Sequence, residues 1–64
     1  MKAGDLVKYK FDAQYRAVVC EDVPENTRKR VSIYVFYTDG VLQPGLWEIT
    51  VSKLTNCFEV INAA

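Results

Sequence analysis

The sequence predicts a single all-β domain, spanning residues 1–64, with about five short strands arranged as a small barrel or sandwich. Three features of the chain support this expectation. Apolar residues alternate with polar ones over short stretches, which is the two-residue period of a strand with one wet face. Turn-forming residues interrupt these stretches roughly every 8–12 residues. Half of the 64 residues are apolar, which is enough for one compact core. The chain is too short to form two such cores.

The first two strands are expected in the N-terminal third of the chain. Val7, Tyr9 and Phe11 alternate with Lys8, Lys10 and Asp12, so the three apolar side chains should share one face. A second strand is expected over Tyr15–Cys20. The following segment, 21–30, is charged and contains Pro and Asn, so it should form an exposed loop.

The third strand carries the strongest strand signal, over Val31–Thr38. Seven of its eight residues are β-branched or aromatic, and none breaks strands. Asp39-Gly40 should end it, because this dipeptide tolerates the positive φ angles of a tight hairpin turn. Val41–Gln43 then begins the return strand. Pro44-Gly45 interrupts it as either a second turn or a bulge, and the missing amide of proline favours an edge strand.

The C-terminal part of the chain predicts the remaining elements. Trp47, Ile49 and Val51 alternate as strand residues on one face, with Trp47 in the core. Ser52–Asn56 should form a single helical turn, followed by a last short strand that contains Phe58 and Val60. No stretch has the length and spacing of a full α-helix.

The order of these elements resembles the SH3-like barrel. The opening Gly4-Asp5-Leu6-Val7, the Asp39-Gly40 turn, Trp47 and the closing Phe58-Glu59-Val60-Ile61 are most similar to short barrels encoded by tailed phages, including marine cyanobacterial phages. The resemblance implies a five-stranded barrel with one short helical turn before the last strand. The chain is more distantly similar to KOW- and Tudor-like barrels, but Ala17 stands where KOW-type barrels carry glycine.

The sequence indicates no catalytic or metal-binding chemistry. It contains no histidine, the usual general base near neutral pH. Its two cysteines lie too far apart for a zinc motif, and three isolated glycines make no phosphate loop. We therefore expect a protein that is not an enzyme and has no cofactor, no metal site and no catalytic residues.

The cysteines and the N-terminus bear on location. No apolar run is long enough for a signal peptide or a membrane span, so a cytoplasmic protein without membrane contact is expected, in the host cytoplasm or the virion if the phage resemblance holds. Cys20 and Cys57 should then stay reduced, and their apolar neighbours indicate buried side chains.

One candidate binding surface emerges from the third strand. The turn at Asp39-Gly40 and the barrel resemblance both favour Val31, Ile33, Val35 and Tyr37 as the core side of that strand. Tyr34 and Phe36 would then point outward, where aromatic rings can bind a protein surface or stack on bases. The basic residues Arg28, Lys29 and Arg30 precede them and could bind phosphate or an acidic partner.

Two functions remain open from the sequence. The first is a non-enzymatic binding or assembly module that uses Tyr34 and Phe36 for protein–protein interaction or self-association. The alternative is a KOW-like nucleic-acid-binding barrel that uses the same rings with Arg28–Arg30. Eight basic and eight acidic residues cancel, which disfavours nucleic acid because phosphate binding usually needs a basic excess.

Overall fold

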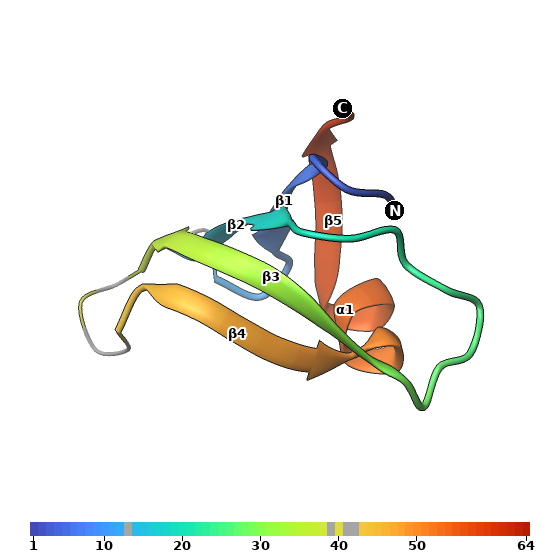
Figure 1. Cartoon of the computed structure of the whole chain (residues 1–64). Coiled ribbons are helices and arrows are strands. Elements are labelled where there is room, and N and C mark those ends of the chain that lie inside the picture. The colour runs from blue at the N-terminus through green and yellow to red at the C-terminus, as the bar shows by residue number, and fades with distance from the viewer. Residues whose placement is uncertain (13, 39, 41–42) are drawn as a thin grey trace.

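The computed structural model describes residues 1–12, 14–38, 40 and 43–64. These residues form five strands and one helix, whose arrangement Figure 1 shows. In chain order these are β1 (Leu6–Tyr9), β2 (Arg16–Val19), β3 (Arg30–Tyr37), β4 (Gly45–Thr50), α1 (Val51–Cys57) and β5 (Phe58–Asn62). Four of the expected strands thus begin or end within a few residues of their predicted positions. In the fourth strand, β4 begins at Gly45, so Gln43, which was expected to belong to the strand, precedes it, while Val41 and Leu42 lie outside the described residues.

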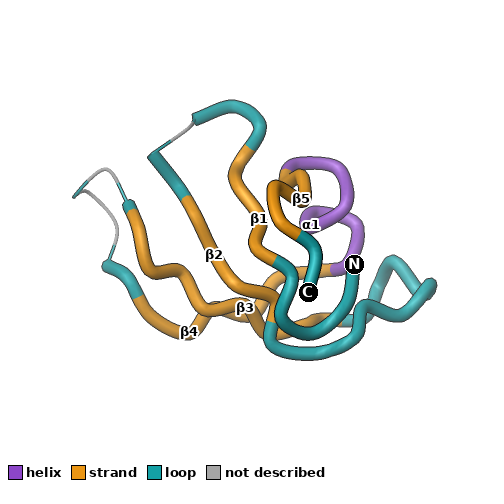
Figure 2. The backbone as a smooth tube through the Cα atoms, turned by 90° about the horizontal axis from the view of Figure 1, so that it is seen from above, coloured by secondary structure: helices purple, strands orange, loops and turns teal. Residues whose placement is uncertain are grey.

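The strands form one antiparallel sheet in the order β4-β3-β2-β1-β5. The chain runs up and down through β1 to β4, and α1 then leads into β5, which pairs with β1 (Figure 1). Within the described residues, no pairing joins β4 to β5, so the sheet is not closed there. The helix packs against both of these edge strands, and Figure 2 shows it between them. The five-stranded, mainly antiparallel sheet with a short helix before the last strand is therefore confirmed.

The core lies on the inner face of the curved sheet, and α1 covers part of it. Alternate residues of the strands point inward, as a period of two requires. The buried apolar residues are Val7, Ala17, Val19, Val31, Ile33, Val35, Val51, Leu54 and Phe58. Three of the four residues expected on the core side of β3 are among them.

The boundary between β4 and α1 differs from the sequence prediction. The Thr50 side chain accepts a hydrogen bond from the Lys53 amide at 3.2 Å, which caps the helix N-terminus. Val51 is therefore the first residue of α1, and its prediction as a strand residue was wrong. The helix has seven residues and exceeds the single turn expected, so the prediction that no stretch forms an α-helix was also wrong.

Tyr37 was expected on the core side of β3, and this prediction was wrong because of a bulge in the pairing of β2 and β3. Arg16 pairs with Tyr37 and Ala17 pairs with Val35, so the register shifts at Phe36. Such a bulge reverses the alternation beyond it. Tyr37 consequently shares the side of Arg16, away from the core, and is 51% exposed.

Two other expected core positions lie at the surface because their strands end early. β1 ends at Tyr9, and Phe11 beyond it is 73% exposed, with its ring against Tyr9 at a centroid distance of 5.4 Å. β2 ends at Val19, and the Cys20 side chain is exposed instead of buried. Val18 and Cys20 lie on the outer side of the alternation, so apolar neighbours alone were a poor indicator of burial.

The first residues of the chain meet its last residue at Asp5. The Asp5 carboxylate accepts hydrogen bonds from the backbone amides of Ala64 at 2.9 Å and Lys2 at 3.0 Å. These bonds, the one from Ala64 first, hold the pKa of this carboxyl below its ordinary value of 3.8. Gly4 allows this approach, because its φ angle is +91° and an added Cβ would lie 3.0 Å from the Ala64 Cβ.

Candidate functional site

An apolar row crosses the face of the sheet opposite the core, which we call the outer face. It consists of four residues in direct cross-strand register: Leu6 pairs with Val18, Val18 with Tyr34, and Tyr34 with Leu46. Tyr34 is 51% exposed and Leu46 is 67% exposed, while Leu6 and Val18 are half-buried. The row is therefore a continuous apolar surface over β1, β2, β3 and β4.

Phe36 extends this surface along β3. It is 47% exposed and lies two residues beyond Tyr34, next to the bulge. The outward orientation expected for Tyr34 and Phe36 is confirmed. The sequence did not indicate Leu6, Val18 and Leu46 as their neighbours, because that requires the registers of three strand pairs.

Charged side chains of both signs flank the apolar row. Lys8 pairs with Arg16 on one side of it, and the Lys8 Nζ lies 3.2 Å from a carboxylate oxygen of Glu59. On the other side, Glu48 pairs with Ser32 and is exposed. Among the described residues, the outer face is thus mixed in charge and not uniformly basic.

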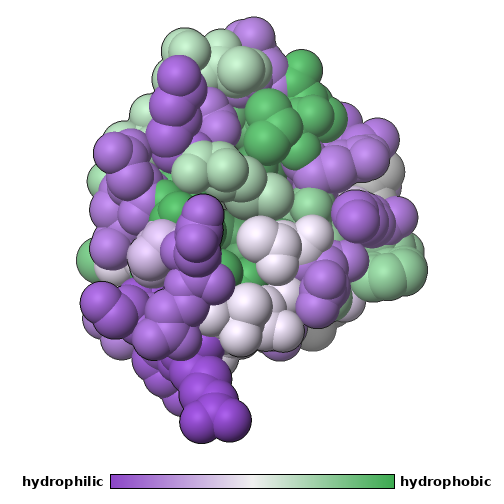
Figure 3. Space-filling model, turned by 90° about the vertical axis from the view of Figure 1, so that its right-hand side faces the viewer, coloured by the Kyte–Doolittle hydropathy of each residue, from purple (hydrophilic) through white to green (hydrophobic). Residues whose placement is uncertain are grey.

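The structure separates the three basic residues that precede β3. Arg30 begins β3 and shares the side of Tyr34 by alternation, whereas Arg28 and Lys29 lie in the loop before it. This loop is tied to the start of α1, where the Val51 amide donates to the Lys29 carbonyl at 2.8 Å. Figure 3 looks onto the side of the molecule that carries the loop, and hydrophilic side chains dominate its lower part.

The acidic residues near this basic run have other partners. Glu21 accepts a hydrogen bond from the Ser32 amide at 3.1 Å, and Asp22 accepts one from the Ala3 amide at 3.0 Å. Among the residues that the structure describes, Arg28, Lys29 and Arg30 make no ion pair. Of the three basic candidates, only Arg30 lies on the same face of the sheet as Tyr34 and Phe36, and it stands at the start of β3, four residues before Tyr34.

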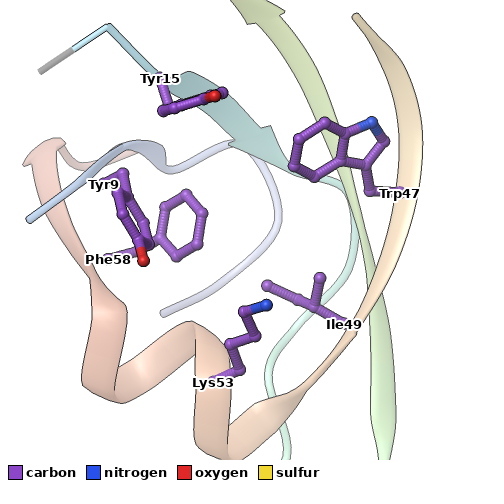
Figure 4. A pocket seen from close by; sticks show the side chains of 6 residues that line it. All are labelled: Tyr9, Tyr15, Trp47, Ile49, Lys53 and Phe58. Carbon is purple, nitrogen blue, oxygen red and sulfur yellow. The ribbon is translucent and has the colours of Figure 1, made fainter. Parts of the chain in front are cut away.

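A second feature lies on the inner face, where the sheet stays open. Here a pocket of about 260 Å³ is lined by Tyr9, Tyr15, Trp47, Ile49, Lys53 and Phe58. Figure 4 shows Tyr9 and Phe58 together on one wall, with Trp47 and Ile49 on the opposite wall. The Tyr9 ring lies 5.3 Å from Phe58 and 6.0 Å from Tyr15, both edge-to-face. Five elements of the chain thus contribute to one mainly aromatic pocket.

Trp47 is a wall of this pocket and not a buried core residue as expected. It pairs with Ile33 across β4 and β3 and packs against the core, but remains half-buried. Its indole Nε1 donates to the Gln43 carbonyl at 3.3 Å. In the sequence, the pocket could be suspected only from Tyr9 and Tyr15, which are aromatic residues at strand ends. They do not show that Trp47 lies opposite them.

In the described part of the chain, no group of three or more His, Cys, Asp or Glu side chains could hold a metal ion. Cys57 is half-buried and Cys20 exposed, and both carry free thiols. No helix in the described ranges has the length and apolar character needed to cross a membrane.

Comparison with known proteins returned no significant match to a family model, a curated protein or a solved structure.

Proposed function

We propose that this protein is a non-enzymatic binding and assembly module that self-associates through the outer face of its sheet. The observation that carries the proposal is the apolar row of Leu6, Val18, Tyr34 and Leu46, continued by Phe36. Isolated apolar residues are common on protein surfaces, but a contiguous apolar surface is typical of an interaction site. Exposed aromatic rings near its centre are the residues enriched in protein interfaces.

The charges around the row favour a second copy of the chain as the partner. A two-fold axis brings the same surface of both subunits together, so that surface must be complementary to itself. The outer face offers this complementarity, because Arg16 and Arg30 lie on it together with Glu48 and Glu59. The same acidic residues oppose a polyphosphate ligand.

A standard dimer interface would cover a large share of the surface of this small chain. The accessible surface of the chain is 4182 Å². A standard interface takes about 800 Å² from each partner, or roughly one-fifth of this total. Self-association through the outer face would therefore cover about one-fifth of the surface of each copy.

We further propose that the open sheet belongs to the SH3-like barrel class, with α1 bridging the gap between β4 and β5. The short helix before the last strand and the pairing of β5 with β1 support this assignment. The origin in a tailed phage rests on the sequence motifs alone. In that setting, self-association would suit an accessory component of the virion.

The test is the solution mass of the chain over a range of concentrations. Sedimentation equilibrium of the wild type from about 10 µM to 1 mM should show a mass rising from 7.3 kDa toward twice that value, as for a Kd in this range. The double variant Tyr34→Ser with Phe36→Ser should remain folded and monomeric. Phe11→Ser, which removes an exposed ring elsewhere, should associate like the wild type.

Two results would refute the proposal. A wild-type chain that stays monomeric over the whole range has no self-association to explain. If the wild type instead binds single-stranded nucleic acid, and its affinity falls as the salt concentration rises, the result would support the nucleic-acid alternative. In that case Arg30→Ala should weaken retention, and Tyr34→Ser should do so as well.

A further inference from the structure

The pocket on the inner face is independent of the outer face and has a distinct chemistry. Its rings come from the end of β1, the segment before β2, the middle of β4 and the start of β5. The single charged side chain among its six lining residues is that of Lys53. Figure 4 shows this side chain extending from α1 toward the middle of the pocket, below Ile49.

The size and lining of the pocket limit what it can hold. Sites for drug-sized ligands usually measure about 300–1,000 Å³, so a pocket of about 260 Å³ suits one ring with a short substituent. Rings that meet edge-to-face offer both edges and faces to a further aromatic ring. A planar aromatic group therefore fits the walls better than a branched polar one.

The charge of Lys53 decides between cationic and anionic ligands. Aromatic walls attract cations through the negative faces of their rings. Here Lys53 already places an ammonium group at this site, and a second cation would be repelled by it. In the described part of the chain, the Lys53 ammonium has no carboxylate partner, so it is available to an anion.

We propose that this pocket binds a single aromatic ring that carries a carboxylate, with the ring among Tyr9, Tyr15, Trp47 and Phe58 and the carboxylate on Lys53. The carboxylate can belong to a free aromatic acid or to the C-terminus of a peptide that ends in an aromatic residue. Both sources present the same chemistry to the pocket. The site does not depend on self-association through the outer face.

The chain carries one tryptophan, and it lines the pocket, so its fluorescence reports directly on occupancy. Titration with phenylacetate should quench or shift Trp47 emission saturably, with a Kd on the order of 1 mM, as expected for a ligand of this size. Phenylacetamide should bind more weakly, and benzylamine more weakly still. Glycylphenylalanine compared with its C-terminal amide tests the peptide source, since only the free carboxylate can pair with Lys53.

Lys53→Met should weaken phenylacetate binding about 3- to 10-fold, the range for an ion pair that is partly exposed. The same substitution at Lys2, an exposed residue near the N-terminus, is the matched control and should leave the Kd unchanged. A thermal melt checks that both variants are folded. The proposal is overturned if phenylacetate gives no saturable change up to about 20 mM, far above the expected Kd. It is also overturned if benzylamine binds more tightly, or if Lys53→Met binds phenylacetate as well as the wild type does.

Discussion

Ile33 and Leu46 offer a direct test of which side of the sheet is the core. Ile33 is fully buried in β3, whereas Leu46 in the neighbouring strand is 67% exposed on the outer face. Replacing either with alanine removes the same number of carbon atoms. Burial of those carbons at position 33 is worth about 2.4 kcal/mol, and the cavity left behind raises the loss to about 3–4 kcal/mol.

The free energy of unfolding of a domain this size is about 3–10 kcal/mol, so Ile33→Ala could abolish folding. Ile33→Val removes one carbon and should cost about 1 kcal/mol. In a urea titration this lowers the midpoint by about 1 M for a small domain. Leu46→Ala should change the free energy of unfolding by at most about 0.5 kcal/mol.

The titrations need low protein concentration, because self-association would add apparent stability to any variant that retains it. The assignment of Ile33 to the core and of Leu46 to the outer face is refuted if Leu46→Ala lowers the urea midpoint as much as Ile33→Val does. It is also refuted if Ile33→Ala leaves the midpoint unchanged. Either result would mean that the core and outer faces of the sheet have been assigned the wrong way round.

Three further predictions concern single substitutions at five positions and are tested by urea titration. Gly4→Val and Gly40→Val should each destabilise the fold by about 1–3 kcal/mol, since both glycines have a positive φ angle. A much smaller loss of stability at Gly4 would contradict the close packing of this residue against Ala64. Because its pKa is lowered in the folded protein, the ionised Asp5 carboxylate stabilises the fold above about pH 4. This stabilisation is lost as the pH falls through the pKa of Asp5 in the folded state. Asp5→Asn should therefore lower the midpoint at pH 7 and flatten its fall between pH 5 and 2, whereas an unchanged profile would exclude this role. Cys20→Ser should leave the free energy of unfolding unchanged, and Cys57→Ser should lower it by about 1 kcal/mol. A larger loss for Cys20→Ser than for Cys57→Ser would contradict the exposure of Cys20 and the partial burial of Cys57.

The strand pattern was predictable where alternation is local. Val31, Ile33 and Val35 lie on the core side of β3, as a period of two requires. Tyr37 could not be assigned in the same way, because a bulge opposite Arg16 shifts the register of β3. A bulge depends on the partner strand and leaves no mark in the alternation itself.

The end of β4 shows a second limit of the pattern. Val51 is buried in α1, and a strand that continued to this position would bury it as well. Its apolar character therefore does not distinguish the two structures. Thr50 was the available signal, because threonine is a favoured residue immediately before a helix.

The two candidate sites differ in how far the sequence could reveal them. Tyr34 and Phe36 belong to one strand, so their shared orientation followed from alternation alone. The apolar row and the inner pocket combine residues of several strands, and they become visible only once the registers are known. Trp47 illustrates this, since its place in the pocket depends on its pairing with Ile33.

The central claim is that two copies of the chain meet through the outer face, and isotope-filtered NMR tests it most directly. The sample is an equimolar mixture of carbon-13-labelled and unlabelled chains at millimolar concentration. Intermolecular nuclear Overhauser effects should join the methyl groups of Val18 and Leu46 to the Tyr34 ring of the other copy. The absence of these contacts in a sample shown to be dimeric, or contacts that involve Ile49 and the pocket instead, would contradict the account.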